Sequence, residues 1–191
     1  MQMSKLGSAL ALAVQAHSGQ VRKSTTIPYI SHPMAVSAIA LEFGATEEQA
    51  IAALLHDAIE DGGPPYANII KETFGAYVHD LVQGCTDGMP DQTGSKAPWL
   101  ERKTAYLEHL QEAPDEVLLV SCSDKLHNAR AIVSDLINEG PSVFNRFRSS
   151  PEQTLWYYRQ LATIFTIRKT PPAKALESAV SQMETLAQSA W

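Results

Sequence analysis

The chain has 191 residues, which suggests one domain that is large enough to bury a sizeable core. Its 45% hydrophobic and 19% charged residues exclude a disordered chain, and its net charge of −6 argues against a general nucleic-acid binder. Two cysteines are too few for a disulfide scaffold or a cysteine-rich zinc site, and the apolar stretches are too short to span a membrane, so we expect a cytoplasmic protein.

Nearly every periodic segment of the sequence predicts a helix. Apolar residues spaced by three and four predict an amphipathic first helix over residues 4–18, in preference to a weak signal peptide. A polar loop follows, and a second helix is expected to start at His32. Thr46 and Gln49 then form a capping box, which predicts that a third helix extends over residues 47–59.

The helical pattern continues after a Gly-Gly-Pro-Pro interruption at residues 62–65. Residues 86–98 form the longest predicted loop, and loops of this length are typical of lids and substrate loops. Helices are expected over residues 66–73, 75–86, 99–112, 114–138, 151–168 and 172–189. Because no repeat and no sustained strand-like alternation occurs, the sequence predicts an all-α fold, a compact bundle of about eight to ten helices in which residues 1–191 form one domain.

Three segments place ionisable side chains against predicted apolar helix faces, namely His32, residues 56–61 (HDAIED) and residues 123–130 (SDKLHNAR). Charges in such places are costly unless they are paired or bound to a metal. Because adjacent helical residues point about 100° apart, His56 and Asp57 need further ligands from other helices to complete a site, and His32 and Asp124 are the candidates. Two imidazoles and two carboxylates suit Mn²⁺, Fe²⁺ or Zn²⁺. Taken alone, a His-Asp pair at a helix end is an ordinary surface feature.

Glu60 and Asp61 follow about one helical turn after His56 and Asp57. Acids at the C-terminal end of a helix oppose the helix dipole, so helix stability does not explain them. One of the two carboxylates is therefore a candidate to orient or deprotonate a metal-bound water. The alternative is a solvated turn that precedes Gly62.

Basic and amide side chains near these acids predict a local anion pocket in an otherwise acidic protein. Arg22 and Lys23 lie in the loop after the first helix, and Asn128 and Arg130 lie in the last motif. An arginine can bind phosphate with its planar fork or stack on a base, and Asn128 could hold a ribose or phosphate oxygen. Each residue taken singly also fits ordinary surface charge, above all Lys125, or a hydrogen bond between two helices for Asn128.

Together these motifs resemble the HD-domain hydrolases, and more closely the hydrolase domain of the RelA/SpoT alarmone family. The matching strings stand in the family's order: GQVRKSTTIPYISHP, AALLHDAIED, FGAYVHDLVQGCTD, ERKTAYL and SDKLHNAR. The resemblance covers roughly residues 5–180, nearly the whole chain. It implies a stand-alone small alarmone hydrolase in an all-α HD domain, without the synthetase and regulatory domains of the bifunctional members.

The resemblance also implies the chemistry. Family members remove the 3′-pyrophosphate of (p)ppGpp, release GDP or GTP and pyrophosphate, and usually use Mn²⁺. By position, the metal ligands correspond to His32, His56, Asp57 and Asp124, the acidic pair for water activation to Glu60 and Asp61, and the substrate contacts to Arg22, Lys23, Asn128 and Arg130. Tyr29 matches a motif residue that we interpret as packing. The expected partner is a small nucleotide, with no nucleic-acid or membrane partner.

Two features depart from the family pattern. Ala131 stands where the family often carries a Thr or Asp near the nucleotide, which puts guanine selectivity in doubt. The loop over residues 86–98 is longer and richer in Gly and Pro than expected. Two alternatives stay open: an HD phosphohydrolase of another nucleotide, such as (p)ppApp or NADPH, and an inactive nucleotide-binding sensor. The complete HDAIED string argues against the sensor, because a binding module needs no acidic pair beside a metal.

Overall fold

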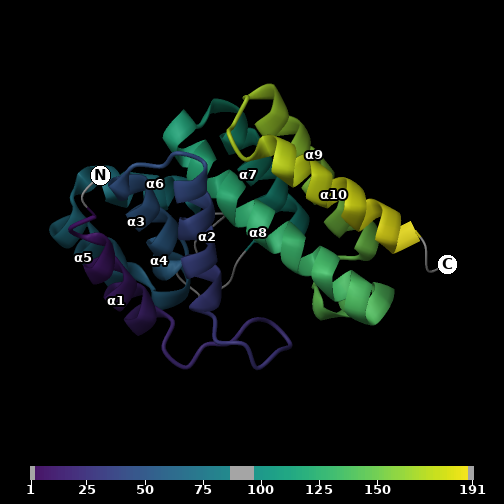
Figure 1. The fold of residues 1–191 in the computed structure, drawn as a ribbon, viewed down its shortest axis with the longest axis horizontal. Helices are drawn as coiled ribbons and strands as arrows, with labels where there is room; N and C mark the ends of the chain where they lie inside the picture. The colour runs from purple at the N-terminus through teal and green to yellow at the C-terminus, as the bar shows by residue number, and fades with distance from the viewer. Residues whose placement is uncertain (1–2, 87–96, 189–191) are drawn as a thin grey trace.

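The computed structural model describes residues 3–86 and 97–188. In these ranges the chain forms ten α-helices and one 3₁₀ helix, η1 (Figure 1). They are α1 (Leu6–Ala16), α2 (Ser31–Glu42), α3 (Glu47–Leu55), α4 (Ala58–Gly62), α5 (Pro64–Phe74), α6 (Ala76–Cys85), α7 (Trp99–Glu112), α8 (Asp115–Glu139), η1 (Gly140–Arg146), α9 (Pro151–Ile167) and α10 (Ala173–Gln188). The all-α prediction is confirmed. None of the described helices has both the length and the apolar character needed to cross a membrane.

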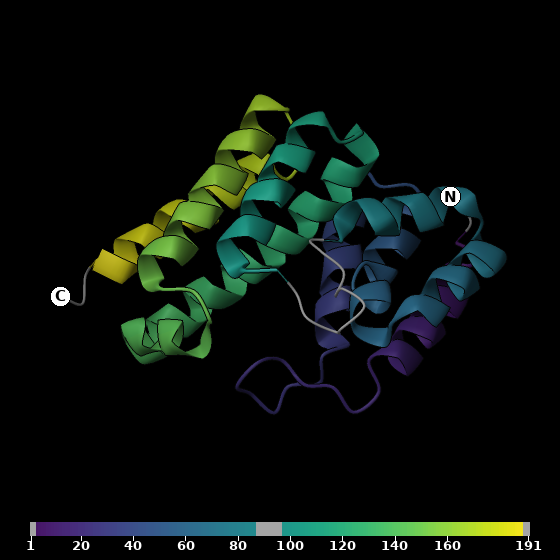
Figure 2. The same ribbon diagram turned by 180° about the vertical axis from the view of Figure 1, so that it is seen from behind.

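Helix α8 runs through the middle of the molecule (Figures 1 and 2). On one side it packs against α2, α3 and α6, and on the other against α9 and α10. Its central residues Cys122, Leu126 and Ala129 are therefore fully buried. A polar side chain in this stretch loses its contact with water, so it has to find a partner inside the protein.

Two capping boxes define helix starts, one of them the predicted box at Thr46. The Thr46 side chain accepts a hydrogen bond from the Gln49 backbone at 3.3 Å, and the Gln49 side chain accepts one from the Thr46 backbone at 2.8 Å. Ser150 and Gln153 do the same at the start of α9. Such caps satisfy backbone N–H groups that have no partner within the helix. The box at Thr46 fixes where α3 begins, and so places His56 at its other end.

The predicted helix over residues 47–59 is interrupted, which corrects the sequence analysis. Helix α3 ends at Leu55, His56 and Asp57 form a turn, and α4 starts at Ala58. The turn lies where these two side chains meet those of α2 and α8. Glu60 and Asp61 consequently lie in the first turn of α4. The argument that they oppose a helix dipole assumed one continuous helix and is wrong.

The loop between α1 and α2 is held by its own backbone hydrogen bonds. It is the purple trace below α2 in Figure 1. The backbone N–H of Arg22 donates to the Ile27 carbonyl at 2.8 Å, and that of Tyr29 donates to the Gln20 carbonyl at 2.9 Å. The bond between Arg22 and Ile27 encloses a tight turn that includes Ser24, whose φ is 58°. The loop therefore holds Arg22 and Tyr29 in defined places near the start of α2.

Candidate metal centre and adjoining pocket

The structure brings the four predicted metal ligands together. His32 lies in the first turn of α2, His56 and Asp57 in the turn after α3, and Asp124 on α8. Asp124 Oδ1 is 3.1 Å from His32 Nε2 and 3.7 Å from His56 Nε2. Asp57 Oδ2 is 2.9 Å from His56 Nε2 and 3.6 Å from His32 Nε2. Three segments far apart in sequence thus form one cluster, in which His32, His56 and Asp124 could hold a metal ion.

The cluster is buried and attracts positive charge. His32, His56 and Asp124 are 1%, 3% and 6% exposed. Burial alone would raise the pKa of Asp124, but Lys125 and the two histidines hold it well below its usual range. Burial opposes protonation of His56, yet Asp57 and Asp124 raise its pKa well above the usual value. A bound cation could supply the positive charge in place of a proton.

The orientation of His56 fits a metal ligand. Its Nδ1 lies 2.8 Å from the Ala53 carbonyl oxygen, to which a protonated Nδ1 donates. The neutral imidazole then carries its lone pair on Nε2, which is buried and makes no hydrogen bond within the described residues. This nitrogen faces oxygens of Asp57 and Asp124. Between this nitrogen and the carboxylate oxygens there has to be either a proton or a metal ion, and the mixed nitrogen and oxygen set fits a divalent ion.

Asp124 is held by two side chains of its own helix. Lys125 Nζ donates to Asp124 Oδ2 at 2.7 Å, and its side chain is only 12% exposed. The interpretation of Lys125 as ordinary surface charge is therefore wrong, because it is a partly buried counter-charge that also lies 5.1 Å from the centre of the Tyr106 ring. Asn128 Nδ2 donates to Asp124 Oδ1 at 2.6 Å, and Asn128 Oδ1 accepts from Arg22 Nη2 at 2.9 Å.

Two further side chains hold His32 and Asp57. His32 Nδ1 lies 2.8 Å from His127 Nδ1. Burial, together with the nearby Arg22 guanidinium, lowers the pKa of His127 to about 4, so His127 is neutral at pH 7 and can accept this hydrogen bond. His32 Nε2 is then free of a proton on the side that faces the carboxylates. The Tyr29 hydroxyl donates to Asp57 Oδ2 at 2.6 Å, which packing alone did not predict.

The predicted acidic pair lies on α4, directly after the cluster. The Asp61 backbone N–H donates to the Asp57 carbonyl at 2.9 Å, which fixes the start of this short helix. The Asp61 side chain is 31% exposed, and its Oδ2 accepts a hydrogen bond from Gln20 Nε2 at 2.9 Å. Glu60 is half-buried. The pair therefore lies about one turn from Asp57, with Asp61 in contact with water.

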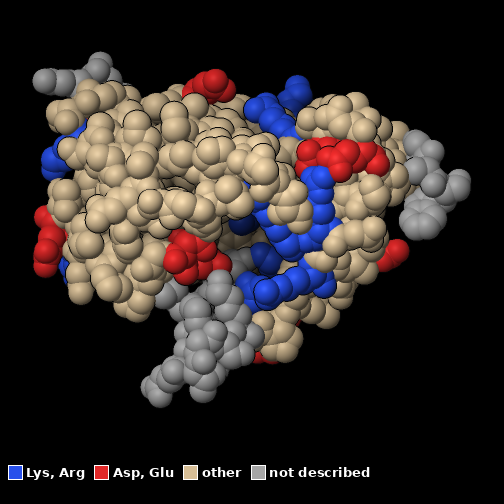
Figure 3. Space-filling view, turned by 90° about the horizontal axis from the view of Figure 1, so that it is seen from below, with Lys and Arg blue, Asp and Glu red and all other residues tan. Residues whose placement is uncertain are grey.

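A cavity of about 420 Å³ adjoins the cluster. Its basic lining residues are Arg22 and Lys23 from the loop after α1, and Arg146 at the end of η1. Lys23 Nζ lies 5.5 Å from the centre of the Phe147 ring, which also lines the cavity. Lys and Arg side chains gather around a hollow on this face (Figure 3). The predicted anion pocket in an acidic protein thus has a physical counterpart.

The cavity and the cluster share part of their walls. Tyr29, His127 and Asn128 line the cavity, and each of them also contacts one of the candidate metal ligands. Ala131 lies one helical turn further along α8 and lines the cavity as well. A ligand in this cavity therefore lies beside the cluster and meets only a methyl group at position 131.

Sequence reasoning missed the residues that close the far side of the cavity. Arg146 and Phe147 line it, and Arg146 Nη1 donates to Asp135 Oδ2, another lining residue, at 3.0 Å. Burial lowers the pKa of the Lys23 amine, and the nearby charge of Arg148 lowers it further. The only sequence signal for these residues is the Arg-Phe-Arg run that starts at Arg146, in which two basic residues flank an aromatic one. This run does not match a motif of known spacing.

Arg130 lies outside this cavity. It is exposed and lines a separate hollow of about 410 Å³ that also includes Ala175 of α10. Two residues along an α-helix correspond to a rotation of about 200°, so Arg130 and Asn128 point to nearly opposite sides of α8. The structure therefore does not bring Arg130 together with Arg22 and Lys23.

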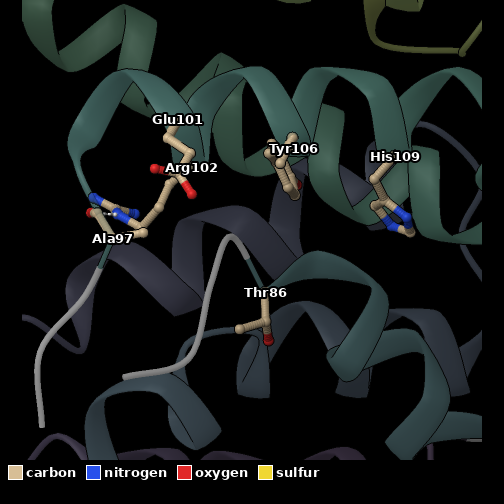
Figure 4. A pocket seen from close by; sticks show the side chains of 7 residues that line it. Thr86, Ala97, Glu101, Arg102, Tyr106 and His109 are labelled. Carbon is tan, nitrogen blue, oxygen red and sulfur yellow. Dashed lines mark hydrogen bonds between the residues drawn. The ribbon is translucent and has the colours of Figure 1, made fainter. Parts of the chain in front are cut away.

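A third hollow, of about 270 Å³, lies between α7 and the end of α6 (Figure 4). Thr86, Ala97, Glu101, Arg102, Tyr106 and His109 line it. The Tyr106 hydroxyl is 2.5 Å from Ser121 Oγ, and Arg102 Nε donates to the Ala97 carbonyl at 3.2 Å. One histidine and one carboxylate do not make a metal site, and none of the predicted site residues lines this hollow. Residues 87–96, most of the predicted long loop, lie outside the described residues.

An all-α bundle with a buried cluster of histidines and aspartates defines a class of metal-binding domain. The HD domain family matches residues 9–150, so the chain belongs to the HD-domain family.

Similar proteins have names that refer to the synthesis or hydrolysis of (p)ppGpp. The chain is 34% identical over 139 residues to the bifunctional (p)ppGpp synthase/hydrolase SpoT of Escherichia coli (strain K12), which covers 70% of this chain and 19% of that protein. It is 36% identical over 125 residues to guanosine-3′,5′-bis(diphosphate) 3′-pyrophosphohydrolase MESH1 of Xenopus tropicalis, covering 64% of this chain and 66% of that protein. The chain thus spans about a fifth of the length of the bifunctional relative.

A solved structure agrees in fold. A metazoan ortholog of SpoT, described as hydrolysing ppGpp, superposes with a TM-score of 0.71 at 23% identity, over 99% of this chain and 97% of that one. At this identity the likeness establishes the fold alone.

Tyr29→Phe should weaken the binding of Mn²⁺ to the metal-free protein by about 10-fold, because the hydroxyl that holds Asp57 is lost while the ring remains. Isothermal titration calorimetry measures the affinity without any substrate. Tyr77→Phe is the matched control, because Tyr77 is 49% exposed and lies outside the cluster. Equal affinity of the Tyr29 and Tyr77 variants would contradict the role of this hydrogen bond.

Proposed function

We propose that the chain is a metal-dependent nucleotide pyrophosphohydrolase that removes the 3′-pyrophosphate of (p)ppGpp and releases GDP or GTP and pyrophosphate. The observation that carries the proposal is the wall shared by the His/Asp cluster and the basic cavity. A phosphorylated ligand bound by the basic residues has its phosphates beside the cluster. The names of the relatives supply the nucleotide, and the geometry supports a reaction at its phosphate end.

His32, His56, Asp57 and Asp124 would hold one divalent ion in this proposal. A mixed set of nitrogen and oxygen ligands suits Mn²⁺, and Zn²⁺ and Fe²⁺ are compatible with it. The ion, when bound, supplies a water of lowered pKa and polarises a phosphoryl oxygen. Hydrogen bonds to Tyr29, His127, Lys125, Asn128 and the Ala53 carbonyl keep the four side chains oriented.

The acidic pair would handle the proton of the attacking water. In the reaction, a water oxygen bonds to the phosphorus next to the 3′ oxygen, the bond between that phosphorus and the 3′ oxygen breaks, and the 3′ oxygen takes up a proton. Asp61, which is partly exposed one turn beyond Asp57, can accept the proton that the water loses, with Glu60 beside it as the second carboxylate.

In the basic cavity, the nucleotide would be bound by Arg22, Lys23 and Arg146. Their cations offset the charge of the phosphates, and Arg22 has a planar guanidinium that can stack on either purine. Ala131 in the cavity wall offers no side-chain hydrogen bond to a base edge. This favours weak discrimination between bases, so ppApp is a second candidate substrate.

A substrate panel tests the proposal. ppGpp, ppApp, NADPH and a simple phosphoester are each incubated with the protein and Mn²⁺, and again with EDTA. We expect ppGpp to yield GDP and pyrophosphate with Mn²⁺ and no product with EDTA, while circular dichroism keeps its helical signal, because the apolar core is independent of the metal. Nucleotide binding without turnover of any compound would instead indicate an inactive sensor.

Glu60→Gln or Asp61→Asn should lower kcat by roughly 100-fold for whichever carboxylate handles the proton. The affinity for Mn²⁺ should stay within about twofold, because neither residue is a proposed metal ligand. Steady-state kinetics and calorimetry on the same preparations separate the two effects. Normal turnover in the double variant would remove the pair from the mechanism.

The unaltered protein should hydrolyse ppGpp and ppApp with kcat/KM values within about 10-fold of each other, because position 131 cannot read a base edge. Ala131→Thr should shift the ratio toward ppGpp. Both ratios come from kcat/KM measured for the two substrates in the two proteins. A strong guanine preference that Ala131→Thr leaves unchanged would show that this position plays no part in recognition.

A further inference from the structure

Asp61 is tied to the loop that follows α1. Gln20 Nε2 donates to Asp61 Oδ2 at 2.9 Å, and His17 Nδ1 lies 3.8 Å from the same oxygen. Helix α1, which leads into this loop, packs against the short helix α4 that carries Asp61 (Figure 1). The contact therefore joins two elements that are neighbours in the fold but 41 residues apart in sequence.

Gln20 is fixed by its backbone and by its side chain. Its backbone N–H donates to the His17 carbonyl at 3.1 Å, and its carbonyl accepts from the Tyr29 N–H at 2.9 Å. Its side-chain Oε1 lies 2.8 Å from His17 Nδ1. His17 is itself only 4% exposed, and its ring centre lies 4.9 Å from that of Tyr29. These hydrogen bonds fix both the backbone and the side chain of Gln20 where it contacts Asp61.

Only one arrangement of hydrogens satisfies both side-chain contacts. An ionised carboxylate accepts hydrogen bonds and donates none, so the amide nitrogen of Gln20 has to face Asp61. The amide oxygen then faces His17, and His17 Nδ1 has to carry the proton. A reversed amide would set two acceptors against each other at Asp61. Asp61 therefore selects the orientation of the amide, and His17 Nδ1–H satisfies the amide oxygen on the other side.

We infer that Gln20, held by its hydrogen bond with His17, is a positioning residue that sets the direction of the Asp61 carboxylate for proton transfer. The inference rests on the proposed role of Asp61. The same unit also adjoins Tyr29, which donates to Asp57. Gln20 thus fixes the position of the proposed proton acceptor, Asp61, relative to the cluster. Gln20 is not a proposed metal ligand, and it does not line the basic cavity.

Gln20→Met tests the inference, because methionine has nearly the same length but no amide donor. We expect kcat to fall about 10-fold, as for the loss of a hydrogen bond to a charged group. KM and the affinity for Mn²⁺ should both stay within about twofold, since neither nucleotide nor metal binding uses this amide. Gln15→Met is the matched control, because Gln15 is an exposed glutamine of α1.

Gln20→Glu is a second variant that guards against misfolding of the first. Glutamate can still accept a hydrogen bond from His17, but it sets a carboxylate oxygen against Asp61 in place of a donor. We expect kcat to fall at least as far as in Gln20→Met, with an unchanged helical circular dichroism signal. Activity equal to that of the Gln15→Met control in both variants would overturn the inference.

A double-mutant cycle separates positioning from a general structural effect. If Gln20 acts through Asp61, Gln20→Met should change kcat by less than about twofold in an Asp61→Asn background. A further 10-fold loss in that background would show that Gln20 does not act through this carboxylate. Asp61→Asn alone tests the proposed function separately: full activity there contradicts the role of Asp61, whatever Gln20 does.

Discussion

Two carboxylates and two imidazoles lie against one another where α2, the turn after α3 and α8 meet. Burying such groups together is unfavourable unless opposite charge and hydrogen bonds compensate for the lost water. The structure provides both: Lys125 lies against Asp124, neighbouring side chains contact His32 and Asp57, and the Ala53 carbonyl contacts His56. The partners come from α8 itself, from the loop before α2 and from the end of α3, so the cluster depends on how these elements pack together.

The partners of the cluster serve a second purpose. Tyr29, His127 and Asn128 hold the proposed metal ligands with one part of their side chains and line the basic cavity with another. Side chains that are already held by buried hydrogen bonds lose little freedom when a ligand arrives. The cavity wall nearest to the cluster is therefore preorganised, while the basic residues Lys23 and Arg146 come from the loop after α1 and from the end of η1.

Local signals in the sequence were sufficient for the helices and for the cluster. The capping box at Thr46 depends only on neighbouring residues, and buried charges such as Asp124 on an apolar helix face need partners wherever they occur. The interruption at His56 could not be predicted, because it depends on where α2 and α8 place their side chains. Lys125 was misinterpreted for the same reason: a single lysine on a helix does not reveal which side of that helix is covered.

The cavity was harder to predict than the cluster. Arg130 stands close in sequence to Asn128, but helical geometry turns it to another side of α8. Arg146 and Phe147 come from a segment without a recognisable spacing, and only the packing of η1 against α8 brings them to the cavity. Arg130 was predicted because it lies close in sequence to Asn128. Arg146 and Phe147 lie far from the motifs in sequence and were not predicted. The contact of Gln20 with Asp61 could not be predicted from the sequence either, because it joins segments 41 residues apart.

Asn128 lies between Arg22, a cavity residue, and Asp124, a proposed metal ligand, and hydrogen bonds to both. A ligand that draws the Arg22 guanidinium to itself changes the bonds of Asn128, and through them the surroundings of Asp124. Occupancy of the cavity and occupancy of the cluster are therefore linked thermodynamically. Such linkage is reciprocal: the factor by which a nucleotide changes the affinity for the ion equals the factor by which the ion changes the affinity for the nucleotide.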